Sequence, residues 1–189
     1  MKKTTIYLIR HCKAEGQEPE AALTEQGKQD AKALVQMLRD IEVDHILASP
    51  YKRAVDTIMP LAEKLNLGIQ RIEGLKERVL SNQPMDDWLV KLEQTFVDKD
   101  IAFEGGESSR EALSRVLQVI EVVLDNEEMN QVVLVSHGNL LSLLINHYNP
   151  AFGFQEWAKM RNPDLFILEL EGNNARIIHH REVNKNPVL

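Results

Sequence analysis

Residues 4–11 read TTIYLIRH, six β-branched, aromatic or aliphatic side chains followed at once by an arginine and a histidine. A short run of this kind that meets polar residues is typical of a buried strand. Residues 131–135, QVVLV, have the same character, and the sequence SHGN follows them at 136–139. The two segments therefore predict two buried strands, each with a histidine at its carboxyl end.

Helical and extended patterns alternate along the rest of the chain. The further elements predicted from hydrophobic spacing are a strand at 44–48, a short apolar piece at 67–72, helices after Thr24, after Ser49-Pro50, over 108–124 and over 140–147, and a closing strand pair at 165–170 and 175–180. This order favours an α/β fold, a three-layer α/β/α sandwich with a mostly parallel central sheet.

We expect one domain over residues 1–189, because no repeat, linker or low-complexity tract divides the chain. Residues 73–106 interrupt the alternation, since they mix turn residues with a helix expected over 86–96. We interpret this segment as a small cap-like insertion.

Composition narrows the classes of function. The chain carries 22 basic and 29 acidic side chains, a net charge of −7, which argues against a general nucleic-acid binder. It has no apolar run near the ~18–20 residues that cross a bilayer and no signal-peptide pattern, so we expect no membrane association and a cytoplasmic location. The single cysteine, Cys12, excludes an internal disulfide and a thiolate zinc site.

Ligands of parallel sheets bind at the carboxyl ends of the strands. Three predicted strands end there in Arg10 and His11, in a Ser-Pro pair with Arg53 close behind, and in a serine followed by His137. Arginine binds phosphoryl oxygens through a fixed charged fork, and histidine can be a neutral nucleophile or a cationic donor near pH 7. The combination suits a phosphoryl group, with His11 in the first of these roles and His137 in the second.

Main-chain amides could add further contacts to the phosphoryl group. We expect the amides of Cys12 and Gly138, and the N-terminus of the helix after His137, to bind its oxygens. A thiol-phosphatase loop is excluded, because it needs an arginine six positions after its cysteine and position 18 is Glu18. Cys12 could nevertheless make the pocket sensitive to thiol reagents.

Five longer segments of the sequence contain these residues or lie between them. Between about residue 4 and residue 145 the chain contains, in this order, LIRHCKAE, ALTEQGKQDA, ILASPYKRAVDTI, GGES and VVLVSHGNLL. They resemble, one by one, the RHG, LTxxG, SxxxRAxxT, GES and VSHG segments of the histidine phosphatase superfamily. That family contains cofactor-dependent phosphoglycerate mutases, fructose-2,6-bisphosphatases and broad-specificity acid phosphatases.

The resemblance implies a role for each matching residue. His11 would attack phosphorus and become a phosphohistidine, while Arg10, Arg53 and His137 bind the phosphoryl oxygens. Neither a metal nor another cofactor is implied, because two arginines and a second histidine already neutralise the charge.

The proton donor of the family lies in an LxE pattern, which Leu75-Lys76-Glu77 matches here. Glu77 would protonate the leaving oxygen and then activate water, with Glu73 as the rival donor. The chain departs from the family where Cys12 replaces a glycine and where Ala14 and Gln17 replace the usual Ser or Thr and Asn. A family phosphate contact is therefore either lost or remade by Gln17.

These observations predict a metal-independent phosphomonoester hydrolase that acts through a phosphohistidine on small phosphorylated metabolites. The insertion is shorter than the segment that closes over the substrate in the mutases, which favours hydrolysis. The alternatives are a cofactor-dependent phosphoglycerate mutase, a catalytically weak phospho-ligand binding or signalling protein, and a protein-phosphohistidine phosphatase. The expected partner is a small phosphorylated substrate, without nucleic acid or membrane, and a homodimer is compatible with the sequence.

Overall fold

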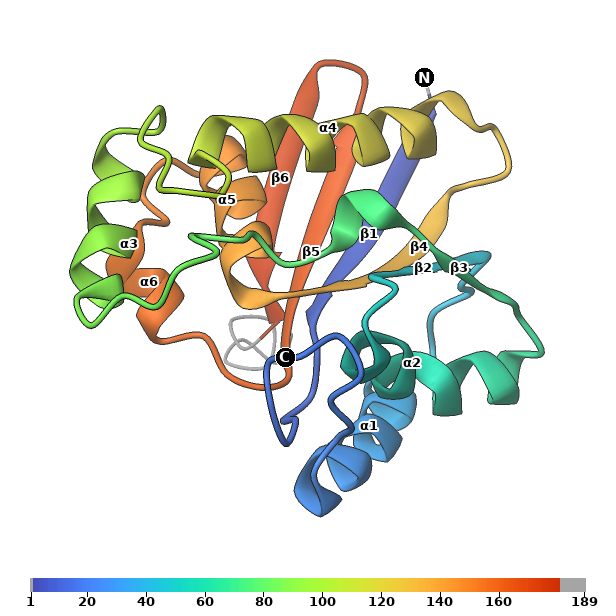
Figure 1. Cartoon of the computed structure of the whole chain (residues 1–189). Helices are drawn as coiled ribbons and strands as arrows, with labels where there is room; N and C mark the ends of the chain where they lie inside the picture. The colour runs from blue at the N-terminus through green and yellow to red at the C-terminus, as the bar shows by residue number, and fades with distance from the viewer. Residues whose placement is uncertain (1, 181–189) are drawn as a thin grey trace, which may run out of the picture.

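Within residues 2–180, which the computed structural model describes, six strands form one sheet and helices cover both of its faces (Figure 1). The strands are β1 (Lys3–Arg10), β2 (His45–Ala48), β3 (Ile69–Arg71), β4 (Gln131–Ser136), β5 (Asp164–Glu171) and β6 (Asn174–His179). The helices are α1 (Glu25–Met37), α2 (Lys52–Leu65), the 3-10 helix η1 (Glu73–Leu75), α3 (Trp88–Val97), α4 (Ser109–Asp125), α5 (Gly138–Tyr148) and α6 (Phe154–Ala158).

The two histidine-tipped segments are neighbouring strands at the centre of the sheet. The order is β3-β2-β4-β1-β5-β6, in which the first four strands are parallel and β5 and β6 form an antiparallel pair beside β1. Arg10 at the end of β1 stands opposite Ser136 at the end of β4. The mostly parallel sheet is as expected, and it brings the carboxyl ends of β1, β2 and β4 to one edge.

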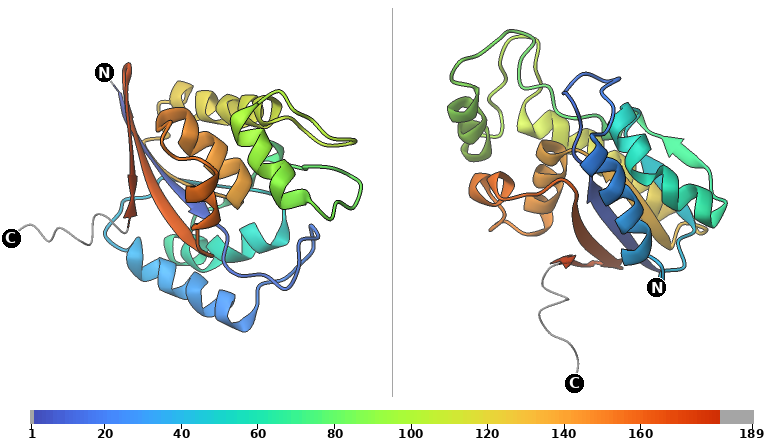
Figure 2. Two further views of the ribbon diagram at one scale, coloured as in Figure 1. Left: turned by 90° about the vertical axis from the view of Figure 1, so that its left-hand side faces the viewer. Right: turned by 90° about the horizontal axis from the view of Figure 1, so that it is seen from below.

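Alternate side chains of the central strands enter two separate cores. Ile6 and Leu8 pack in the core beneath α4 and α5, whereas Tyr7 and Ile9 pack in the core beneath α1 and α2. Figure 2 shows these two helix pairs on opposite sides of the sheet. Burial on both faces explains why the strands read as continuous apolar runs, and it confirms the three-layer sandwich.

One helix begins where the sequence predicts, and the bounds of others differ from the prediction by one or two residues. Thr24 caps α1 as predicted, since its hydroxyl accepts a hydrogen bond from the amide of Gly27. Helix α5 begins at Gly138, two residues before the predicted start, and α3 covers 88–97 instead of 86–96. Helix α6 was not predicted, because five residues are too few to show a helical period.

The insertion is fastened to the rest of the molecule through Arg78. The buried guanidinium donates through Nη1 to the hydroxyls of Thr95 on α3 and Ser109 on α4, at 2.8 and 3.0 Å. Its Nε and Nη2 donate to the main-chain oxygen of Glu107 at 3.0 and 2.9 Å. One side chain therefore ties the segment after η1 to two helices.

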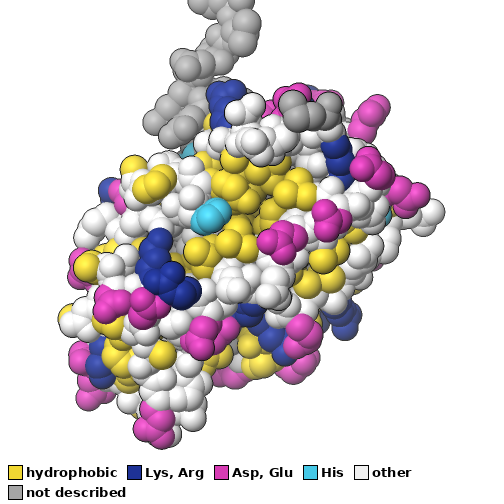
Figure 3. All heavy atoms as spheres, turned by 90° about the horizontal axis from the view of Figure 1, so that it is seen from above, with side chains coloured by type: hydrophobic (Ala, Val, Ile, Leu, Met, Phe, Trp, Pro, Cys, Tyr) yellow, Lys and Arg dark blue, Asp and Glu magenta, His cyan; other side chains and the backbone are white. Residues whose placement is uncertain are grey.

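The surface agrees with the acidic composition. On the face seen in Figure 3, acidic side chains are spread around a central group of hydrophobic ones. No helix in the described range 2–180 is both long and apolar enough to cross a membrane.

Candidate active site

His11 sits at the end of β1 with its two ring nitrogens in different environments. Nδ1 lies 2.7 Å from the main-chain oxygen of Cys12, and a carbonyl oxygen can only accept, so Nδ1 carries the hydrogen. Nε2 then carries the lone pair, and Nε of Arg53 donates to it at 3.2 Å. Burial, and secondarily the charges of Arg53 and Arg10, lower the pKa of His11 to about 4. The imidazole is therefore neutral at pH 7, with its lone pair on Nε2.

Arg53 reaches this nitrogen from the first turn of α2, and its side chain is almost fully buried. Its Nη1 donates to the main-chain oxygens of Gln17 and Glu18 at 3.0 and 2.9 Å, and its Cζ lies 5.0 Å from the ring centre of Tyr51. Burial lowers the pKa of Arg53, yet an arginine remains charged at any physiological pH. The loop after β1 and helix α2 thus hold a fixed cation against the nucleophile.

Thr57 links the same loop to α2, and it corrects one of our expectations. The Cys12 amide, expected to bind phosphate, donates to the Thr57 hydroxyl at 2.8 Å, and that hydroxyl donates to the Arg53 main-chain oxygen at 2.7 Å. The Cys12 side chain is fully buried in the core beneath α1 and α2. Burial raises the pKa of the Cys12 thiol to about 12, so the thiolate that reacts with thiol reagents is scarce at pH 7.

His137 follows β4 and faces the nucleophile. Its ring centre lies 5.1 Å from that of His11 in an edge-to-face arrangement, and its Nε2 lies 2.7 Å from the hydroxyl of Ser49 at the end of β2. Within the described residues, Nδ1 of His137 has no hydrogen-bond partner. Burial first, then the neighbouring His11, Arg53 and Arg10, hold the pKa of His137 well below 6.5. The cationic state that we expected for it therefore needs a bound anion.

Arg10 packs against the start of α5. A Cβ atom at Gly138 would lie 2.9 Å from both Cζ and Nε of Arg10, so the glycine is what permits this close approach. Nη1 of Arg10 donates to the main-chain oxygen of Met160 at 3.0 Å, whereas its buried Nε lacks a partner among residues 2–180. Burial lowers the pKa of Arg10, partly offset by the charges of Glu77 and Asp164.

Glu77 occupies the N-terminus of α5. Its Oε2 accepts from the amide of Asn139 at 3.0 Å, and its Oε1 accepts from the amides of Leu140 and Arg78, both at 2.9 Å. We expected the amides at the N-terminus of this helix to donate to phosphoryl oxygens. Those of Asn139 and Leu140 donate to the Glu77 carboxylate instead. Helix α5 therefore positions the glutamate.

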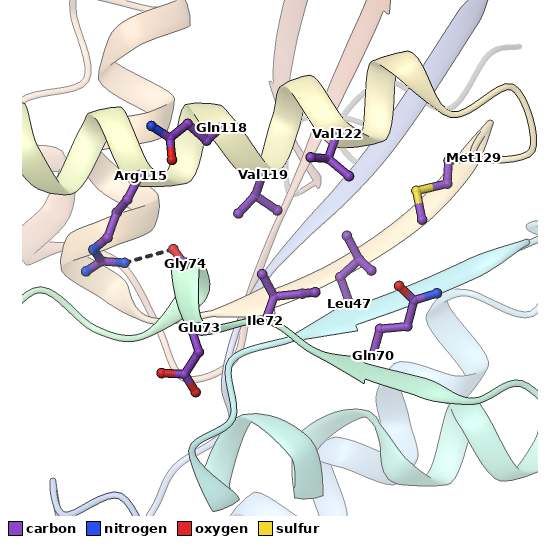
Figure 4. A pocket seen from close by; sticks show the side chains of 10 residues that line it. All are labelled: Leu47, Gln70, Ile72, Glu73, Gly74, Arg115, Gln118, Val119, Val122 and Met129. Carbon is purple, nitrogen blue, oxygen red and sulfur yellow. Dashed lines mark hydrogen bonds between the residues drawn. The ribbon is translucent and has the colours of Figure 1, made fainter.

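Glu73 lies elsewhere. Its exposed side chain forms an ion pair with Lys76 and lines a cavity of about 490 Å³ between α4 and the edge of the sheet. Figure 4 shows this cavity, whose walls include Leu47, Ile72 and Val119. Of the two candidate donors, the structure brings Glu77 to the site and not Glu73.

Two adjoining cavities form a cleft over the site. One, of about 440 Å³, includes Arg10 and Gly138 in its lining, and the other, of about 580 Å³, includes Arg53 and Tyr51. Both are lined by Gln17, Glu77, Arg78, Leu80 and Trp88. The cleft is thus lined by five of the residues predicted from the sequence and by residues of the insertion, whereas the buried His11 and His137 are not among its lining residues.

Two residues that position the site were missed by the sequence analysis. Asn162 donates through Nδ2 to the main-chain oxygen of His11 at 2.8 Å, and no local pattern signals a contact across 151 positions. Thr57 was visible as the final threonine of the ILASPYKRAVDTI segment, where it went without a role.

Comparisons with known proteins show which family and which fold the chain resembles. The model of the histidine phosphatase superfamily (branch 1) matches residues 6–183. A probable phosphoglycerate mutase of Erwinia tasmaniensis is 28% identical over 157 residues, 75% of this chain and 73% of that protein. Phosphoserine phosphatase 1 of Hydrogenobacter thermophilus is 30% identical over 149 residues, 70% of each chain. Among solved structures, a mycobacterial glucosyl-3-phosphoglycerate phosphatase has a TM-score of 0.74 at 22% identity, covering 94% of this chain and 98% of that one.

Proposed function

The chain belongs to the histidine phosphatase superfamily, and on that basis we propose that it hydrolyses small phosphomonoesters, without a metal, through a phosphohistidine on His11. The observation that carries the proposal is the state of the His11 ring. Its Nδ1–H donates to a carbonyl oxygen and the pKa of His11 lies near 4, so Nε2 is unprotonated at pH 7. A neutral, oriented imidazole is what nucleophilic attack on phosphorus requires.

In the first half of the reaction, Nε2 of His11 bonds to phosphorus while the bond from phosphorus to the ester oxygen breaks. The transferred oxygens carry negative charge, which Arg10, Arg53 and His137 stabilise. Because Nε of Arg53 donates to Nε2 in the free protein, the incoming phosphoryl group must take over that contact. The negative charge of the bound phosphoryl group favours protonated His137, because it offsets the effect of burial on the pKa of this histidine.

Glu77 serves both halves of the reaction in this proposal. In the free protein Glu77 is a carboxylate that accepts from three main-chain amides, so it must take up a proton from solvent or from the phosphomonoester monoanion before it acts. The carboxyl then gives this hydrogen to the departing oxygen, and the resulting carboxylate removes a proton from the water that attacks the phosphohistidine. The second step releases inorganic phosphate and restores neutral His11. Support comes from its place in the cleft beside Arg10, where α5 amides fix both of its oxygens.

The test is hydrolysis of p-nitrophenyl phosphate in EDTA between pH 5 and pH 8, with wild type and His11→Ala side by side. We expect turnover in the wild type and none above background in the variant, and acid-quenched wild-type protein should carry acid-labile phosphate. Turnover that survives His11→Ala, or that vanishes in EDTA, would contradict the proposal.

A phosphoglycerate mutase activity is the second candidate, favoured by the similarity to the Erwinia tasmaniensis protein of that name. It predicts that 2,3-bisphosphoglycerate primes the interconversion of the phosphoglycerates. If hydrolysis and priming both fail while phosphate still binds, the protein is a phospho-ligand binder.

A further inference from the structure

The cleft beyond the phosphoryl-binding residues has an apolar wall. The 440 Å³ cavity is lined by Arg10, Gln17, Glu77 and Gly138, and the side chains Leu80, Trp88, Leu92 and Trp157 also line it. We propose that this wall binds a flat, apolar leaving group, so that the substrates are phosphomonoesters of aromatic or extended apolar alcohols. The inference rests on the proposed function, since the leaving group is the part of the substrate that lies outside the phosphoryl site.

Two aromatic rings, Trp88 and Trp157, belong to the wall, and two further rings pack behind them without lining the cavity. Trp88 on α3 meets Trp157 on α6 edge to face, with ring centres 6.5 Å apart and planes at 87°. Trp157 stacks on Phe154 at 5.3 Å, and Phe154 meets Phe96 of α3 at 5.9 Å. Such ring pairs hold one another in place, so the insertion and α6 present a preformed surface.

Trp88 is also unusually accessible for its size. It is 49% exposed and lines both cavities. A large, exposed apolar side chain that lines a cavity together with polar residues commonly contacts a ligand. Burying it against a ring would remove apolar surface of both partners from water.

The charges of the cleft disfavour a second anionic group on the substrate. Arg78 lines both cavities, but Nε, Nη1 and Nη2 all donate to Glu107, Thr95 and Ser109. A carboxylate beyond the phosphoryl group would meet this occupied guanidinium and the carboxylate of Glu77. Phosphoserine and 3-phosphoglycerate carry such a carboxylate, so we expect both to be poor substrates.

The experiment compares esters with matched chemistry at the departing oxygen. Hexyl phosphate, 2-phenylethyl phosphate, phosphoserine and 3-phosphoglycerate all release a primary alcohol, and 2-naphthyl and phenyl phosphate both release a phenol. We expect kcat/KM to be higher for the first two alkyl esters than for the two carboxylates, and about tenfold higher for naphthyl than for phenyl.

Substitutions in α3 test whether the apolar wall contacts the leaving group. Trp88→Ala should lower kcat/KM for 2-naphthyl phosphate by about tenfold, mainly through KM, and leave phosphoserine within about twofold. Trp88→Phe should restore most of the preference, because it keeps a ring. Val97→Ala is the matched control on the same helix, since Val97 is 87% exposed and lies outside both cavities.

Binding can be measured apart from turnover in His11→Ala protein. The chain has two tryptophans and both line this cavity, so their fluorescence reports its occupancy. Benzylphosphonate should quench it and bind more tightly than methylphosphonate, and Trp88→Ala should remove the difference. Turnover that favours phosphoserine over hexyl phosphate, or equal binding of the two phosphonates, would overturn the inference and leave the proposed function standing. Absence of turnover with every ester would instead overturn the proposed function.

Discussion

The side-chain amide of Asn162 donates to the main-chain oxygen of His11 over 2.8 Å, although 151 positions separate the two residues. On its other side, the His11 amide donates to the main-chain oxygen of Ser136 at 3.0 Å. Hydrogen bonds to both its main-chain oxygen and its main-chain amide therefore hold the backbone of the nucleophile, and neither bond uses a ring nitrogen.

Asn162→Ala should lower kcat by about tenfold or more and leave KM nearly unchanged, because small displacements of a reacting group are costly. Steady-state kinetics with p-nitrophenyl phosphate measure the split. The control is Asn173→Ala, in the exposed turn between β5 and β6, which should retain wild-type kcat. A rise in KM at constant kcat would show that Asn162 acts on substrate binding instead.

Stability should fall on acidification through His11. Burial lowers its pKa from 6.5 to about 4, so the folded protein binds this proton less readily than the unfolded chain does. The contribution is complete above pH 6.5 and is lost as the pH falls towards 4. Between pH 7 and pH 5, wild type should lose about 2 kcal/mol more unfolding free energy than His11→Asn does. Urea unfolding of both proteins at the two pH values checks this, and equal losses would contradict it.

Glu77→Gln should separate substrates by their leaving groups. An alkyl alcohol needs a proton to depart and p-nitrophenolate does not, so the loss should be at least about tenfold larger for alkyl esters. Glu73→Gln is the matched control, because Glu73 lies at the other cavity and should leave both rates unchanged. Equal loss on both substrates in Glu77→Gln would reject Glu77 as the acid.

Cys12 should be inert in the folded protein. Its thiol is fully buried and its pKa is raised to about 12, so the reactive thiolate is neither accessible nor populated at pH 7. We expect Ellman's reagent to modify it only after urea unfolding, with activity retained under native conditions. Rapid native labelling together with loss of activity would place the thiol in the cleft after all.

Patterns in short stretches of sequence were enough to predict the layers and the convergence of Arg10, His11, Arg53 and His137. Strands that are buried on both faces can be recognised in a sequence as apolar runs. Parallel strands bring the polar residues at their carboxyl ends to the same edge of the sheet. The direction of individual hydrogen bonds could not be predicted in this way. The Cys12 amide donates to Thr57, and the amides of Asn139 and Leu140 donate to Glu77. Each partner comes from a distant segment whose placement depends on the assembled core.

The strand order has a consequence for biosynthesis. Both neighbours of β1 in the sheet, β4 and β5, come from residues 131–171. Strand β1 is synthesised first, and it cannot pair until most of the chain has been synthesised. Pairings across such long sequence separations are slow to form, and an unpaired apolar strand invites association with other chains. Nascent chains that stop short of β4 should therefore depend on chaperones, and we expect a product that lacks β5 to leave one edge of β1 unpaired.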